Sequence, residues 1–301
     1  MKLRLRSALT ATCAALACAT MSVPVASAQL SSQSSLPSLS SSQATESGEA
    51  ATTGTLGNAD IRTLPSGRTF LVVKPQNYDP AQTYPVILAF GGWNVTPERM
   101  MRDTRIDGAA PDAVVIYPAG IDNAWAGAPY AATSINQDVA FIRTIIDDAA
   151  SHYSGNADEV YAVGHSNGGG MAAALACHAP ELVDGIATVS GAFYDPTVQG
   201  CKSAAVPALL IHDTADGVIS YEGGVRHDAP YQGVEKVFAS FGTRNTCDMS
   251  TLTERVEGPA TVVTPAGCLA PTQLLRISGY GHGWPAVPPA SATVATFFNS
   301  L

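Results

Sequence analysis

Short apolar runs alternate with amphipathic segments along most of the chain. Several runs have the length and composition of buried strands: residues 86–90, 113–117, 159–163, 185–189, 208–212 and 274–278. The segments between them have the spacing or composition of helices: residues 136–153, 171–177, 234–246 and 291–299. Residues 68–74 have polar neighbours and predict a strand at the edge of the sheet. Strands that alternate with helices predict an α/β fold, with a mainly parallel central sheet and helices on both faces.

Polar residues follow the ends of these strands. Gly91 and Gly92 follow one strand, two aspartates follow another, and His282 follows the last. Because ligands of parallel sheets bind at the carboxyl ends of the strands, we expect these residues to share one rim.

The most informative stretch is residues 164–168, Gly-His-Ser-Asn-Gly, between an apolar run and an alanine-rich one. A strand, a sharp turn and a helix with serine at the apex would hold the hydroxyl of Ser166 clear of the sheet. Glycines two places before and after the serine leave room for strand and helix to meet. Ser166 is therefore the candidate nucleophile.

A serine hydroxyl is a poor nucleophile unless a base takes its proton and a third group orients that base. The candidate base is His282, which has glycine on both sides and follows the last strand. The candidate acid is Asp216, which lies further into its loop than the alternative, Asp213. The N–H groups of Asn167 and Gly92 are the candidate oxyanion donors.

The N-terminal part predicts export. Residues 1–28 begin with three basic residues, continue with an apolar run and end in Ala-Ser-Ala, which predicts a signal peptide. Residues 29–57 are rich in Ser and Gln and predict a disordered spacer, so that the catalytic domain spans residues 58–301. We expect the protein to be secreted, either free or associated with the cell wall through its spacer.

Four cysteines follow the predicted leader. In an exported chain they predict two disulfides with three possible pairings, and proximity favours Cys177–Cys201 and Cys247–Cys268. No Cys-x-x-Cys or His/Cys cluster indicates a metal, and we expect no cofactor. The formal net charge of −9 argues against nucleic acid and anionic lipid as partners. We expect a monomer without a stable membrane insertion.

The motifs together resemble a known family. G-H-S-N-G-G-G-M, H-D-T-A-D-G-V-I-S-Y-E-G-G, Y-P-A-G with a following Trp125, and G-Y-G-H-G-W-P occur in this order. They resemble the secreted polyhydroxybutyrate depolymerase-like esterases, which include feruloyl and acetylxylan esterases. The resemblance implies an α/β-hydrolase fold and a Ser166, Asp216, His282 triad. One departure is Phe90, where the family usually has histidine in the oxyanion loop.

The resemblance implies hydrolysis of hydroxyalkanoate, feruloyl or acetyl esters, either small or derived from a polymer. The chain's three tryptophans each follow a strand and are candidates for substrate contact: Trp93, Trp125 and Trp284. Two alternatives stay open. One is an envelope acyltransferase of the mycolyltransferase type on the same fold, and the other is a binding module without activity.

Overall fold

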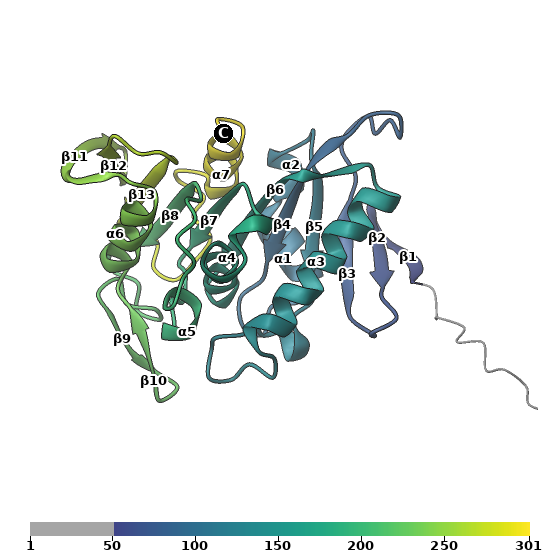
Figure 1. Cartoon of the computed structure of the whole chain (residues 1–301), viewed down its shortest axis with the longest axis horizontal. Helices are drawn as coiled ribbons and strands as arrows, with labels where there is room; N and C mark the ends of the chain where they lie inside the picture. The colour runs from purple at the N-terminus through teal and green to yellow at the C-terminus, as the bar shows by residue number, and fades with distance from the viewer. Residues whose placement is uncertain (1–50) are drawn as a thin grey trace, which may run out of the picture. The chain divides into compact units, whose positions relative to one another are not determined.

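The structure is a computed structural model, and residues 51–301 are described here (Figure 1). The predicted signal peptide and most of the predicted spacer lie outside the described residues. The end of the spacer, however, belongs to the fold, because β1 (Thr52–Leu56) pairs antiparallel with β2 (Ala59–Thr63). The expected domain start near residue 58 is therefore a few residues too late. All five residues of β1 are exposed, so the strand has no hydrophobic pattern to reveal it.

An 11-stranded sheet forms the centre of the fold, in the order β1-β2-β3-β5-β4-β6-β7-β8-β13-β12-β11. Its parallel central strands are β5 (Val114–Pro118), β4 (Tyr84–Phe90), β6 (Gly155–His165), β7 (Gly185–Val189), β8 (Ala208–Asp213) and β13 (Thr272–Ile277). Antiparallel strands extend both sides: β1, β2 and β3 (Thr69–Val73) on one, β12 (Ala260–Ala266) and β11 (Asp248–Glu257) on the other. The predicted parallel sheet is confirmed.

Two strand predictions need correction. The strand at residues 68–74 is not an edge, because β3 lies between β2 and β5. The segment between Cys247 and Cys268, for which no strand was predicted, forms the β11–β12 hairpin that continues the sheet. Every residue of β11 but one is exposed, so its threonines and charges do not alternate with core residues.

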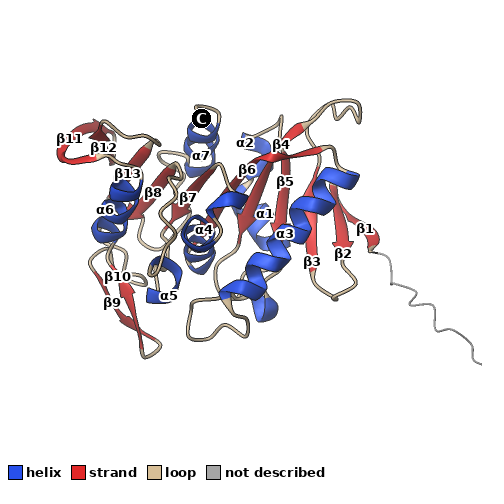
Figure 2. Cartoon of the chain, in the orientation of Figure 1, coloured by secondary structure: helices blue, strands red, loops and turns tan. Residues whose placement is uncertain are grey.

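Helices cover both faces of the sheet, as Figure 2 shows in blue. One core contains side chains from α3 (Ile135–His152), α4 (Asn167–His178) and α6 (Val234–Arg244). The other contains side chains from α1 (Pro97–Thr104), α2 (Ile106–Ala109) and α7 (Ala290–Phe298). Strand β4 serves both, because Leu88 and Phe90 belong to the first core and Ile87 and Ala89 to the second.

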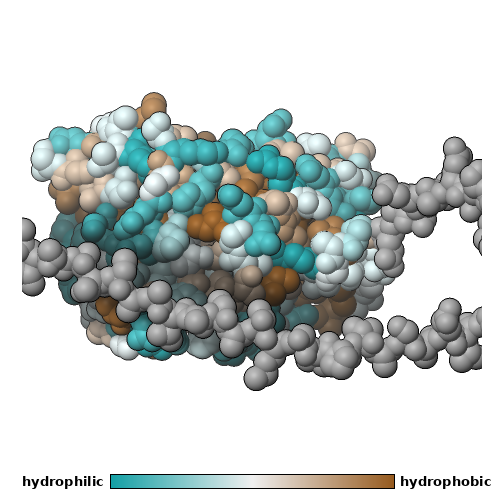
Figure 3. All heavy atoms as spheres, turned by 60° about the horizontal axis from the view of Figure 1, so that its bottom comes forward, coloured by the Kyte–Doolittle hydropathy of each residue, from teal (hydrophilic) through white to brown (hydrophobic). Residues whose placement is uncertain are grey.

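The remaining elements are short. They are α5 (Asp195–Val198), two 3-10 turns (Ile121–Asn123 and Pro180–Leu182), and the hairpin of β9 (Gly223–Arg226) and β10 (Ala229–Gln232). None of the helices in residues 51–301 combines the length and apolar composition that a membrane span requires. On the face shown in Figure 3, hydrophobic residues form separate brown patches among hydrophilic ones.

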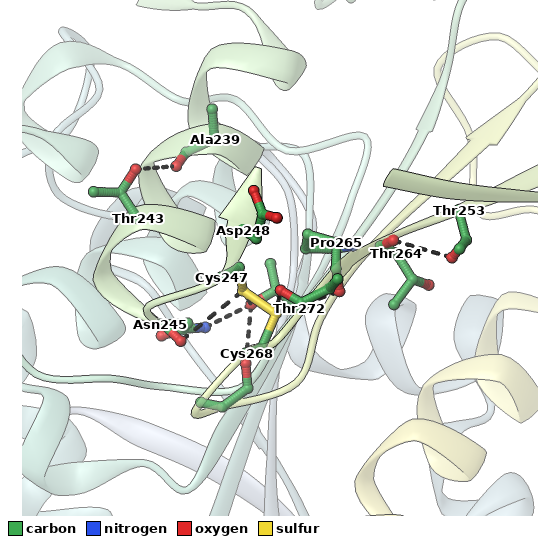
Figure 4. Close-up of a disulfide and its surroundings, with 12 residues drawn as sticks. Ala239, Thr243, Asn245, Cys247, Asp248, Thr253, Thr264, Pro265, Cys268 and Thr272 are labelled. Atoms are coloured by element: carbon green, nitrogen blue, oxygen red, sulfur yellow. Dashed lines mark hydrogen bonds between the residues drawn. A yellow bond between two sulfur atoms is a disulfide. The ribbon is translucent and has the colours of Figure 1, made fainter. Parts of the chain in front are cut away.

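Both disulfides favoured by proximity are present in the structure. Cys177–Cys201 links the last turn of α4 to the segment after α5. Cys247–Cys268 closes the base of the β11–β12 hairpin (Figure 4). Next to it, the buried Asn245 side chain donates to Thr272 Oγ1 at 2.7 Å and also binds the backbone of Val206. Through Asn245, the base of the hairpin is thus held next to β8 and β13, the strands that precede Asp216 and His282.

Candidate active site

Ser166 stands at a strained turn between β6 and α4. Its φ of 54° and ψ of −118° lie outside the regions that residues other than glycine usually adopt. A Cβ on Gly164 would lie 2.1 Å from the carbonyl oxygen of Gly168, and one on Gly168 would lie 2.2 Å from that of Phe90. The two glycines of the motif are therefore required by close backbone packing, which holds the serine in place.

The structure brings Ser166, His282 and Asp216 into one hydrogen-bonded line. His282 Nε2 lies 2.9 Å from Ser166 Oγ, and His282 Nδ1 lies 2.8 Å from Asp216 Oδ2. With a neutral imidazole, Nδ1–H donates to the carboxylate and Nε2 accepts from the hydroxyl. These three side chains follow β6, β8 and β13, at the carboxyl ends of parallel strands of the same sheet.

Asp216 is buried and rich in hydrogen-bond donors. Its Oδ1 accepts from the backbone N–H groups of Val218 at 2.8 Å and Ile219 at 2.9 Å. Burial alone would raise the pKa of this carboxyl, but hydrogen bonds from two histidines and two backbone N–H groups together hold it well below its usual range. Asp216 is therefore an anion at neutral pH and can accept the hydrogen bond from His282.

The second of these histidines is His212, which reasoning from the sequence missed. Its buried ring donates from Nε2 to the carbonyl oxygen of Ile219 at 3.0 Å and lies 3.3 Å from Asp216 Oδ2. The His-Asp-Thr-Ala-Asp spacing places it four residues before the acid, at the end of β8. His212 and His282 thus both lie against the same carboxylate oxygen of Asp216.

Asp213, the alternative acid, has another place. Its Oδ1 accepts from the N–H of Ala215 at 2.7 Å, and its Oδ2 accepts from the N–H groups of Tyr280 and Gly281, the latter at 2.8 Å. Asp213 thus holds the backbone of the loop that carries His282 but does not contact the imidazole. Asp213 therefore binds the backbone of the histidine loop, and Asp216 binds the imidazole ring.

His165, the residue before Ser166 in the chain, also belongs to the site. It lines the pocket beside Ser166, and its ring centre lies 5.1 Å from that of His282. Burial, with the neighbouring His282 charge, lowers the pKa of His165 to about 3. Its ring is therefore neutral and forms part of the wall.

The two predicted oxyanion donors lie beside the serine. Asn167 is the first residue of α4, where N–H groups have no helical acceptor. A Cβ on Gly92 would come within 3.2 Å of Ser166 Cβ, so the Gly92 backbone lies against Ser166. The Asn167 side chain binds the backbone of Trp125 on both sides, with N–H to Oδ1 at 2.7 Å and Nδ2–H to the carbonyl at 3.1 Å.

Two of the three tryptophans do not line the pocket, which corrects the expected substrate contacts. Trp125 is 2% exposed, packs edge-on against Phe90 and donates from Nε1 to the carbonyl oxygen of Gly91 at 3.1 Å. It supports the loop that contains Gly91 and Gly92. Trp284 packs against the second core and donates from Nε1 to Ser291 Oγ at 2.9 Å. It anchors the histidine loop to α7.

Trp93 does line a pocket, of about 320 Å³, that opens next to Ser166. It is 41% exposed and stacks on Tyr130, with ring centres 4.3 Å apart. The ring of His227, at the tip of the β9–β10 hairpin, meets both of these rings edge-on at 5.0 and 5.1 Å. Tyr194 also lines the pocket and holds the hairpin, since its hydroxyl donates to the carbonyl oxygen of Arg226 at 3.5 Å.

The sequence did not predict that Trp93, Tyr130 and His227 form one aromatic wall. Its other half, the loop of Tyr130, is fastened by the buried Asp138 at the start of α3. Asp138 accepts hydrogen bonds from the N–H of Ala126 at 2.9 Å and from the hydroxyl of Thr133 at 2.8 Å. The three aromatic residues are visible in the sequence, but they lie in separate loops, and their spacing does not indicate that these loops meet.

Comparison with known proteins identifies the family of the chain. The family model described as "Putative esterase" matches residues 61–218. The chain is similar to "Putative esterase NocK" of Nocardia uniformis subsp. tsuyamanensis, with 28% identity over 67% of this chain and 65% of that protein. It is also similar to "Feruloyl esterase C" of Emericella nidulans, with 25% identity over 73% of this chain and 78% of that protein.

A solved structure with a similar fold is that of an acetyl xylan esterase from Aspergillus awamori. The TM-score is 0.58 at 13% sequence identity, over 83% of this chain and all of that one. At this identity the likeness shows the α/β-hydrolase fold alone. The family match covers more than half of the chain, and the chain therefore belongs to the Esterase family.

Proposed function

We propose that this esterase is a secreted serine hydrolase that cleaves its substrate through an acyl-enzyme on Ser166. The observation that carries the proposal is the line of hydrogen bonds from Ser166 Oγ through His282 to Asp216, at the mouth of a pocket. Secretion is supported by the predicted signal peptide at residues 1–28 and by the two disulfides.

In the first half of the reaction, Ser166 Oγ attacks the carbonyl carbon of the ester while His282 Nε2 takes the hydroxyl proton. Asp216 keeps Nδ1 protonated and stabilises the imidazolium that forms. The carbonyl oxygen becomes an oxyanion, which the N–H groups of Asn167 and Gly92 stabilise. The imidazolium then returns its proton to the alcohol oxygen as the C–O bond breaks, leaving the acyl group on Ser166.

In the second half, a water molecule takes the place of the alcohol. His282 Nε2 accepts a proton from this water as its oxygen attacks the acyl-enzyme, and the same proton returns to Ser166 Oγ when the second tetrahedral intermediate collapses. The products are the carboxylic acid and the free serine. One imidazole thus serves as base and as acid in both halves.

The proposed substrates are feruloyl, acetyl or hydroxyalkanoate esters. The first two are supported by the names of the similar proteins and the third by the motifs quoted above. The stacked pair of Trp93 and Tyr130 offers a flat apolar surface to an acyl chain or ring. Acetyl esters would leave most of the pocket of about 320 Å³ empty, which favours the larger acyl groups.

A panel of p-nitrophenyl acetate and butyrate, methyl ferulate and a hydroxybutyrate dimer tests the proposal. We expect hydrolysis of several esters, and labelling by a fluorophosphonate probe that peptide mapping assigns to Ser166. Absence of hydrolysis together with absence of labelling would overturn it. A sugar acceptor in the same assay tests the alternative: an acylated sugar as the main product would make the chain an acyltransferase.

A further inference from the structure

The pocket beside Ser166 has a charge that is opposite to the charge of the whole protein. The chain carries 25 Asp and Glu against 16 Lys and Arg, a formal net charge of −9. Two arginines line the pocket, Arg99 and Arg226, but no aspartate or glutamate does. The anion of the site, Asp216, is buried behind His282, so the lining that a ligand meets has positive and no negative side chains and favours a negatively charged ligand.

The two arginines approach the pocket from different elements. Arg99 belongs to α1, which follows the oxyanion loop, and its Nε lies 3.2 Å from Asp103 Oδ2. Arg226 ends strand β9 at the tip of the hairpin, and it has no carboxylate partner within ion-pair distance among residues 51–301. The guanidinium of Arg226 is thus open to a ligand, whereas that of Arg99 is partly neutralised.

Both charges act on groups in the pocket wall. Burial raises the pKa of the Tyr130 and Tyr194 hydroxyls, and the charge of Arg226 opposes that rise in each. The charge of Arg99 contributes to the lowering of the pKa of His165. The two guanidinium groups line the pocket and therefore act electrostatically on side chains of its wall.

We propose that this pocket selects esters that carry an anionic group, a carboxylate, on the part of the substrate that reaches past the aromatic pair to Arg226. Arg226 is the main determinant, and Arg99 adds to the field. The inference rests on the proposed esterase site and deepens it. A guanidinium binds a carboxylate in a fork of two N–H donors, so the preference is one of geometry as well as of charge.

Matched substrates test the preference, because each pair differs in charge but hardly in shape. On the acyl side the pairs are the mono-p-nitrophenyl esters of glutaric and adipic acid and the corresponding ω-amides. On the alcohol side the pair is 4-carboxyphenyl butyrate and 4-carbamoylphenyl butyrate. Each kcat/KM is divided by the rate constant for hydrolysis by hydroxide, which removes differences in intrinsic reactivity.

We expect the anionic member of at least one pair to be preferred about fivefold at low salt, as for a partly exposed ion pair. The preference should shrink in about 0.5 M NaCl, because salt screens exposed charges. Arg226→Gln should remove most of the preference and Arg226→Lys should keep part of it. Arg99→Gln should remove a smaller part of the preference. Its matched control is Arg102→Gln, since Arg102 also lies on α1 and contacts Asp103 but does not line the pocket.

Two results would overturn the inference: equal rates within all pairs, or a preference that Arg226→Gln and Arg99→Gln leave intact. Labelling of each variant by the fluorophosphonate probe excludes misfolding as the cause of a loss. If the wild-type protein hydrolyses the anionic esters and their neutral, amide-bearing counterparts equally well, only the anionic selectivity is refuted. Failure to hydrolyse any member of the panel would refute the esterase proposal itself.

Discussion

The two sides of the pocket are built in different ways. On one side Ser166 is enclosed by backbone so closely that a methyl group on Gly164 or Gly168 would overlap a carbonyl oxygen. On the other side the β9–β10 hairpin projects at the lower left of Figure 1, with most of β9 exposed. It meets the body of the protein through stacked and edge-on rings. Core packing thus fixes the reacting atoms, whereas a projecting hairpin shapes the space for the substrate.

The largest expected effect comes from removing the nucleophile. Ser166→Ala should lower kcat by about 10⁴- to 10⁶-fold, in the range of triad deletions in other serine hydrolases. Circular dichroism should show an unchanged fold. The control is Ser154→Ala, which changes another serine with a left-handed φ at the opposite end of β6. If Ser166→Ala keeps a tenth of the activity, Ser166 is not the nucleophile.

The next effect separates the two aspartates of one loop. Asp216→Asn should lower kcat by about 10⁴-fold, because an amide no longer holds the imidazole in the required tautomer. Asp213→Asn should cost far less in kcat, since Asp213 binds only the backbone of the histidine loop. Its main effect should be a lower melting temperature. Steady-state kinetics and thermal melts of both variants decide, and the opposite ranking would move the acid to Asp213.

The same contrast explains what the sequence can predict. The strand–serine–helix turn and the parallel sheet follow from local signals, namely apolar runs and glycines whose spacing has a steric cause. The choice of Asp216 over Asp213 rested on distance along the loop, which happened to correspond to the reach of the carboxylate. Trp125 and Trp284 have the same local signal as Trp93, a position after a strand. Only the tertiary structure shows which of the three faces the pocket.

The β9–β10 hairpin could not be predicted from the sequence. Val225 is exposed, and the turn at His227 and Asp228 uses two left-handed residues that are not glycine. Such a hairpin has neither an alternating hydrophobic pattern nor the Asn-Gly type of turn that usually reveals one. Its stability comes from contacts with Tyr194 and Tyr130, which lie far away in the sequence. Contacts of this kind cannot be inferred from the residues of the hairpin alone.

A smaller effect should appear in the pH dependence of stability. The pKa of His165 is lowered to about 3 in the folded chain, mainly by burial, against about 6.5 in an unfolded one. Between these values the unfolded state binds the extra proton, so stability falls as the pH falls below about 6.5. We expect a loss of about 2 kcal/mol between about pH 7 and pH 5 from this group. Urea unfolding of wild type and His165→Asn measures it, and equal losses in both proteins would contradict the assignment.

The smallest expected effect is on the hairpin side, where Trp93 bridges the two walls. Trp93 follows Gly92, the proposed oxyanion donor, in the chain, and its ring stacks on Tyr130. If the ring binds substrate, Trp93→Ala should raise KM for a feruloyl or butyryl ester about tenfold, or about 1.4 kcal/mol, with little change in kcat. Trp93→Phe keeps an aromatic surface and should restore most of the affinity. A fall in kcat at unchanged KM would instead mean that the ring positions the backbone of Gly92, and Trp93 would then belong to the catalytic side of the pocket.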